Sequence, residues 1–171
     1  AAQRIVSTEG TSGGARVTAS AGNALSADGA QINAAKDIYL VGGNVALKSG
    51  TIQAGENVNL VAVRDFATNG NSAAAGKDHV IYLDGAKIKG KDVTTLSGKV
   101  QMVNAAEIEG TNDASLYIGN TFTKTADDKV TTYATKENTL DMRASKVTAP
   151  EVGLSAAGAG IFDHSIVAGT T

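Results

Sequence analysis

Apolar and polar positions follow a nine-residue outline that recurs along the chain from Ile32 onward. The outline has a leading Ile, a small or polar centre and a closing Leu. Four copies share it: INAAKDIYL (32–40), IQAGENVNL (52–60), IKGKDVTTL (88–96) and IEGTNDASL (108–116). A shorter copy is VTAPEVGL (147–154), and IVAGTT (166–171) begins a sixth. The starts of the first four are 20, 36 and 20 residues apart, and a period near 20 predicts an array of stacked units.

The short runs between the turn residues favour β-strands. Residues 45–47, 57–60 and 80–83 are rich in β-branched residues and mostly alternate with a period of two. The segments between them contain Gly, Asn and Asp, which form turns. No window has a helical apolar stripe, and each unit has too few Leu residues for a leucine-rich repeat. We therefore predict an all-β fold, a parallel β-helix (solenoid) of about 20-residue coils, with residues 1–171 as a single β-helical segment.

Stacked coils place equivalent residues in columns, and two apolar columns are expected to form the core. The first contains the leading residues Ile32, Ile52, Ile88, Ile108, Val147 and Ile166. The second contains the closing residues Leu40, Leu60, Leu96, Leu116 and Leu154. The repeat is also supported by the position five residues before the leader, which is Leu47, Leu83, Val103, Met142 or Ile161 in five copies and Ala27 in the remaining one. Each Ile or Leu buried in this way contributes about 1.5 to 3 kcal/mol relative to exposure.

Two segments interrupt the period, at about residues 62–79 and 119–138. In the second, residues 121–125 and 129–133 flank Ala126-Asp127-Asp128, a pattern typical of a β-hairpin. The first contains the turn dipeptide Asn69-Gly70. Two interpretations stay open: each insertion is a degenerate extra coil, or the two insertions form a recognition surface. If they leave the same corner two coils apart, they emerge about 10 Å from each other.

Candidate partner-binding residues, on the recognition interpretation, come from both insertions. They are Phe66, Asn69, Phe122, Lys124 and Tyr133.

Composition limits the partners. A net charge of -2, with 15 basic and 17 acidic residues, gives no electrostatic footprint for nucleic acid. No apolar run approaches the roughly 20 residues of a membrane-spanning helix, so neither nucleic-acid binding nor membrane insertion is predicted. The absence of Cys is compatible with the cytosol or with a secreted chain that avoids disulfides.

A polar column recurs four or five residues after the leader. Its members are Asp37, Asn57, Asp92, Asp113 and Glu151. A calcium ladder or a row of catalytic carboxylates is one interpretation; turn capping is the other, and the alternation of Asp with Asn favours it. His79 and His164 lie 85 residues apart and are interpreted as surface or turn residues. We therefore predict no catalytic, cofactor-binding or metal site, and no enzyme activity.

The unit VALKSGTIQAGENVNLVA (45–62) resembles the repeats of filamentous haemagglutinin and its relatives, the large exoproteins of two-partner secretion in Gram-negative bacteria. That family includes adhesins, haemolysins and the stick proteins of contact-dependent growth inhibition. The haemolysins are virulence proteins. The resemblance covers most of residues 25–171. It implies a right-handed β-helix, export through an outer-membrane transporter and display on the bacterial cell surface, of which this chain is an internal fragment. The family's secretion-domain motifs and toxin domains are not found, so no residue in those roles is carried over.

These observations predict a structural and adhesive shaft segment of a secreted or cell-surface exoprotein. Its partners would be a receptor or glycan on a host or neighbouring cell. One alternative is a β-helical glycan-processing or tailspike-like enzyme, in which two or three carboxylates converge in a groove. Another is a carbohydrate-binding module that uses the aromatic residues of the insertions.

Overall fold

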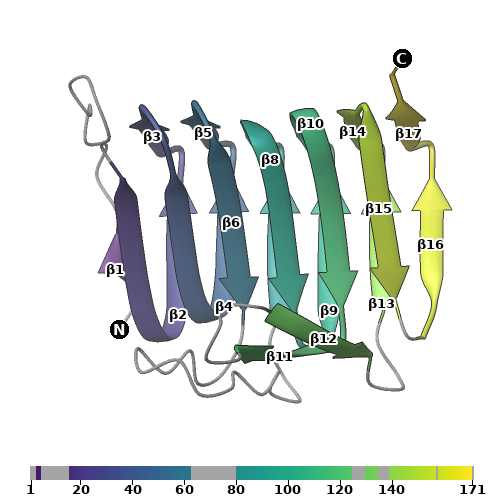
Figure 1. Cartoon of the computed structure of the whole chain (residues 1–171), viewed down its shortest axis with the longest axis horizontal. Coiled ribbons are helices and arrows are strands. Elements are labelled where there is room, and N and C mark those ends of the chain that lie inside the picture. Colours follow the sequence, from purple (N-terminus) through teal and green to yellow (C-terminus); the bar gives the residue numbers. More distant parts are fainter. Residues whose placement is uncertain are drawn as a thin grey trace.

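The chain folds into β-strands, and no helix occurs in the part that the structure describes. This computed structural model describes residues 3–4, 16–62, 80–124, 130–134, 139–156 and 158–170. All strands but two join one parallel sheet (Figure 1). The two-residue β1 (Gln3–Arg4) pairs with the long β2 (Val17–Asp28). The predicted all-β class and parallel pairing are therefore confirmed.

Strand segments from successive parts of the chain pair in parallel register at three positions of the sheet. The first stack contains β3 (Gln31–Ala34), β5 (Thr51–Ala54), the start of β8 (Lys87–Ser97), the start of β10 (Glu107–Ile118), β14 (Lys146–Ala149) and β17 (Ile166–Gly169). The second contains the start of β2, the start of β4 (Ile38–Lys48), β6 (Asn57–Ala62), the ends of β8 and β10, and β15 (Glu151–Ala156). The third contains β1, the ends of β2 and β4, β7 (Val80–Asp84), β9 (Val100–Asn104), β13 (Thr139–Arg143) and β16 (Gly160–Asp163). The bends within the long strands carry the chain from one stack to the next (Figure 1).

The column of leading residues, and the apolar position five residues before each leader, follow the repeat except at the last coil. Ile32, Ile52, Ile88, Ile108 and Val147 pair in one row, but the row continues to Val167. The choice of Ile166 was wrong, since Ile166 pairs with Lys146. In the third stack, likewise, Met142 pairs with Phe162 and not with Ile161. Ile166 was chosen as the leader because it is an isoleucine. A coil length of about 20 residues, counted from Val147, gives Val167 instead.

The second column differs at β8. Leu60 and Leu116 both pair with Thr95, while Leu96 pairs with Val61 and Tyr117. The register shifts because β8 has one residue fewer than β10 at its bend: Gly90 pairs with Gly110, but Asp92 pairs with Asp113. Because side chains alternate between the faces of a strand, this shift turns Thr95 inward and Leu96 outward. Placing Leu96 in the core column was therefore wrong.

The corners between the third and first stacks share one backbone conformation. Each contains a residue with positive φ: Gly29, Ser49, Gly85, Ala105, Ala144 and His164. Five of these residues donate their backbone N–H to a carbonyl of the following coil, at 2.7 to 2.9 Å. The repeated corner satisfies backbone groups that leave the strand ladder.

Candidate functional site: the corner that carries the insertions

Both insertions follow the same corner, between the second and third stacks. The uninterrupted form of this corner is Gly98-Lys99, which connects β8 to β9. The insertions begin after Ala62 and after Ile118, and both of these residues pair with Ser97. The two points of departure are thus two strand spacings apart, about 10 Å. The condition under which the two insertions emerge close together, a common corner, is therefore met.

The second insertion contains an antiparallel β-hairpin. β11 (Asn120–Lys124) pairs with β12 (Val130–Ala134) in a register that runs from Asn120↔Ala134 to Lys124↔Val130. Figure 1 shows the pair at the ends of the parallel strands, where β8 and β10 finish. Gly119, at φ 76°, precedes β11 and provides the left-handed conformation that glycine adopts most readily. The predicted hairpin pairing is confirmed for these two strands.

Three of the five candidate partner-binding residues lie on this hairpin. Phe122 and Lys124 are in β11, and Tyr133 is in β12 opposite Thr121. Phe66 and Asn69 belong to residues 63–79, which lie outside the described residues, as does His79. The structure therefore places Phe122, Lys124 and Tyr133 on one two-stranded element.

The predicted polar column also exists as a row in the second stack. Asn57, Asp92, Asp113 and Glu151 pair in succession. Contacts run mainly between coils: Asn57 Nδ2 donates to Asp37 Oδ1 at 2.8 Å, and Asn112 Nδ2 donates to Asp92 Oδ1 at 2.6 Å. Side chains of this row thus form hydrogen bonds between neighbouring coils. The sequence predicted turn capping within a coil.

Asp37, directly before β4, is joined to this row through Asn57. Hydrogen bonds from the Asn57 side chain, and then from Arg16 Nη2 at 3.2 Å, lower the pKa of the Asp37 carboxyl against the opposing effect of its burial. Arg16 also stacks over the Tyr39 ring at 5.1 Å from the ring centroid. Two side chains, Asn57 and Arg16, thus bind this carboxylate, and Arg16 in turn contacts Tyr39.

A charged ladder covers the outer face of the first stack. Lys87 and Lys89 reach Glu107 and Glu109 at 3.6 and 2.8 Å. The four side chains line a shallow depression together with Thr51 and Gln53. Such exposed ion pairs contribute about 0 to 1 kcal/mol each. Each carboxylate faces a lysine across the strands, and the ladder contains no pair of glutamates in mutual contact.

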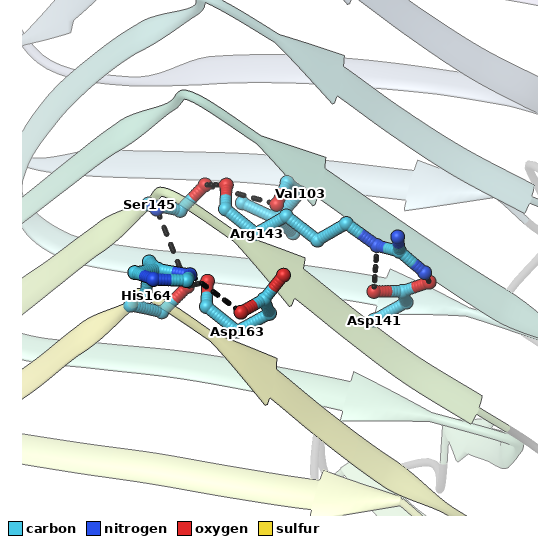
Figure 2. Close-up of polar contacts among 7 residues, drawn as sticks. Val103, Asp141, Arg143, Ser145, Asp163 and His164 are labelled. Atoms are coloured by element: carbon cyan, nitrogen blue, oxygen red, sulfur yellow. Dashed lines mark hydrogen bonds and ion pairs between the residues drawn. The ribbon is translucent and has the colours of Figure 1, made fainter.

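A second polar group lies near the last coils (Figure 2). Arg143 holds Asp141 through two hydrogen bonds of 2.9 and 3.0 Å, which raise the pKa of the guanidinium. His164 Nδ1 is 2.6 Å from Asp163 Oδ1 at an exposed corner. Ser145 Oγ donates to the Val103 carbonyl at 2.9 Å and accepts from Ala106 N–H at 3.1 Å. This group connects corners, and within the described residues no cluster of three or more His, Cys, Asp or Glu side chains suits a metal ion.

A buried polar group in the β8–β9 coil was not foreseen. Thr95 Oγ1 donates to Gln101 Oε1 at 2.6 Å, and Gln101 Nε2 donates to the Tyr117 carbonyl at 3.0 Å. Ser97, beside them, is fully buried, and its Oγ has no hydrogen-bond partner among the residues that the structure describes. The position of Asp92 is the one sequence signal of this altered coil. Asp92 follows its leading Ile by four residues, whereas Asp37, Asn57 and Asp113 follow theirs by five.

The comparisons with known proteins give no relative. No protein-family model, curated protein or solved structure matches the chain. Within the described residues, no helix is long and apolar enough to cross a membrane.

Proposed function

We propose that this chain is a segment of a right-handed parallel β-helix of the filamentous haemagglutinin type. Its role is that of a shaft, which holds recognition elements away from the surface of a bacterial cell. One observation carries the proposal: six coils repeat three strand positions in register, and the two departures from the repeat share one corner. A repeating core supplies length and stiffness, and a shared corner points the insertions to one side.

The stacked contacts support the mechanical part of this role. Isoleucine rows, inter-coil amide–carboxylate bonds and the lysine–glutamate ladder all run along the stacking direction. Each coil therefore contributes the same kinds of contact to its neighbours, and adding a coil adds a similar interface. A fibre can be lengthened in this way without a new core.

The insertions supply the adhesive part of the proposed role. Solenoids often carry their binding residues on insertions along one face. The hairpin carries Phe122, Lys124 and Tyr133 on two adjacent strands. We propose a receptor or a glycan on a host or neighbouring cell as partner, with export through an outer-membrane transporter.

Replacement of the hairpin tests this function directly. In the variant, Gly-Lys replaces residues 119–138, as in the native connection between Ser97 and Val100. Labelled protein is incubated with epithelial cells, with Gram-negative bacteria and on a glycan array. We expect wild-type protein to bind one of these targets and the variant to lose at least tenfold in binding.

A matched replacement of residues 63–79 by Gly-Lys shows which insertion contributes. Loss of binding in either replacement supports presentation from this corner. Retention of full binding when both insertions are replaced together would remove the adhesive role. Failure of the wild type to bind any of the targets would count against it as well.

A further inference from the structure

The outer face of the second stack carries an apolar row beside the insertion corner. Val41, Val61, Leu96 and Tyr117 pair in succession across four strands, and they form a hydrophobic cluster separate from the main core. The next residue of each of the last three strands is Ala62, Ser97 or Ile118, the corner from which the insertions depart. We call these four residues the outer apolar row.

The burial of the two central residues of this row, Val61 and Leu96, requires a cover, whereas Val41 and Tyr117 at its ends are half-buried. Leu96 is 1% exposed and Val61 is 8% exposed, although both point away from the core between the stacks. Neighbours in a flat sheet contact a side chain from the sides and leave its tip open. Tyr39 and Tyr82, which also face outward, are only half-buried. Another part of the molecule therefore covers the tip of Leu96.

The register shift in β8 places Leu96 in the outer apolar row, and the same shift destabilises the core. One residue fewer at the β8 bend puts Leu96 outside and brings Thr95 inside, where it needs Gln101 as partner. Burying polar groups in place of leucine lowers stability unless each is hydrogen-bonded. Ser97, in the same coil, makes no such bond to any described residue. The burial of Leu96 on the outer face of the sheet compensates for this loss of stability.

We propose that the β11–β12 hairpin docks on the outer apolar row, with Leu96 as its central contact. The hairpin starts directly after Tyr117, Ile118 and Gly119, so its base is covalently joined to the row. The N–H of Gly119 donates to the carbonyl of Ser97 at 2.8 Å, which holds that base against β8 beside Leu96. The left-handed turn at Gly119 takes the chain out of the parallel ladder at this point. The shaft thereby fixes the orientation of the hairpin, whatever the hairpin binds.

Two leucine substitutions form a matched test. Leu96 and Leu116 are both fully buried, on adjacent strands, but face opposite sides. We expect Leu96→Ala to speed hydrogen exchange of the amides of residues 120–134 at least tenfold, with little change in the core strands. We expect Leu116→Ala to lower the global unfolding midpoint and to speed exchange across the stacked strands. If Leu96→Ala leaves the exchange of residues 120–134 unchanged, the proposal is wrong.

Replacement of each insertion identifies the cover. Gly-Lys in place of residues 119–138 should expose Leu96 and increase the fluorescence of 1-anilinonaphthalene-8-sulfonate severalfold. A further Leu96→Thr substitution should reverse that increase. If dye binding instead increases only when residues 63–79 are replaced, the first insertion is the cover and the proposal fails. These readouts do not depend on cell binding, so their outcome is separate from that of the proposed function.

Discussion

At the scale of single residues, the repeated left-handed corner puts several L-residues where glycine is preferred. Ala105 and Ala144 have φ of 47° and 45°, while the equivalent Gly29 and Gly85 both have φ of 62°. A left-handed conformation costs an L-residue about 1 to 2 kcal/mol. The two alanines therefore hold strain that the two glycines avoid.

Ala105→Gly is expected to stabilise the fold. Relief of the left-handed strain exceeds the extra backbone entropy of glycine in the unfolded chain, and we expect a gain of about 0.5 to 1 kcal/mol. Urea unfolding measures the change. Ala106→Gly is the control, because Ala106 is adjacent, buried and without positive φ. That control should lose about 1 to 2 kcal/mol from its methyl group and its entropy; equal effects at both positions would contradict the argument.

A residue-scale prediction on pH follows from Asp37. Its pKa is lowered in the folded protein, so the stabilisation is complete above the unfolded pKa, about 3.9, and is lost as the pH falls through the folded value. We expect the free energy of unfolding of wild type to fall more steeply below about pH 4 than that of Asp37→Asn. Urea unfolding from pH 6 to 2.5 measures both slopes. Asn57→Ala, which removes the principal donor, should also flatten the curve; three parallel curves would show that Asp37 does not contribute.

At the scale of elements, the periodicity predicts which segments are strands and which residues lead each coil. Ile32 to Val147 follow that prediction because every coil must return to the same interior position. The spacing of eight residues from Ile88 to Leu96, however, matches the other copies and hides the shorter bend of β8. The offset of Asp92 contains that information, but only pairing with a neighbouring strand shows which face Leu96 takes. The cover of Leu96 is a tertiary contact, and a repeat pattern in the sequence does not predict such contacts.

The β8–β9 coil provides an element-scale prediction. Thr95→Val leaves Gln101 Oε1 buried without its donor, and such a group costs about 1 to 3 kcal/mol. Combining Thr95→Val with Gln101→Leu removes both partners and should recover most of that loss. A double-mutant cycle by urea unfolding is expected to give a coupling energy of about 0.5 to 3 kcal/mol. Additive effects of the two substitutions would mean that their hydrogen bond does not stabilise the coil.

At the scale of the whole molecule, the repeated registers mean that stability is spread over successive coils. Within the described strands of the parallel sheet, each turn of the chain pairs with the turn before it and the turn after it. In such an array, the free energy of unfolding approximates a sum of coil and interface contributions. A complete coil is then a removable unit, whereas part of a coil is not.

Deletion of residues 31–50 tests this property. The deletion removes one 20-residue coil, from β3 to the end of β4, and joins Ala30 to Thr51. These residues already lie close, since Thr51 N–H donates to the Ala30 carbonyl at 2.8 Å. We expect the variant to fold with a lower unfolding free energy, a smaller urea m-value and a maximum dimension about 5 Å shorter by small-angle X-ray scattering. Deletion of residues 31–40 alone shifts the three stacks against each other and should abolish cooperative unfolding. If both deletions unfold the protein to the same degree, the coils are not equivalent units and the proposed shaft could not be lengthened by repetition.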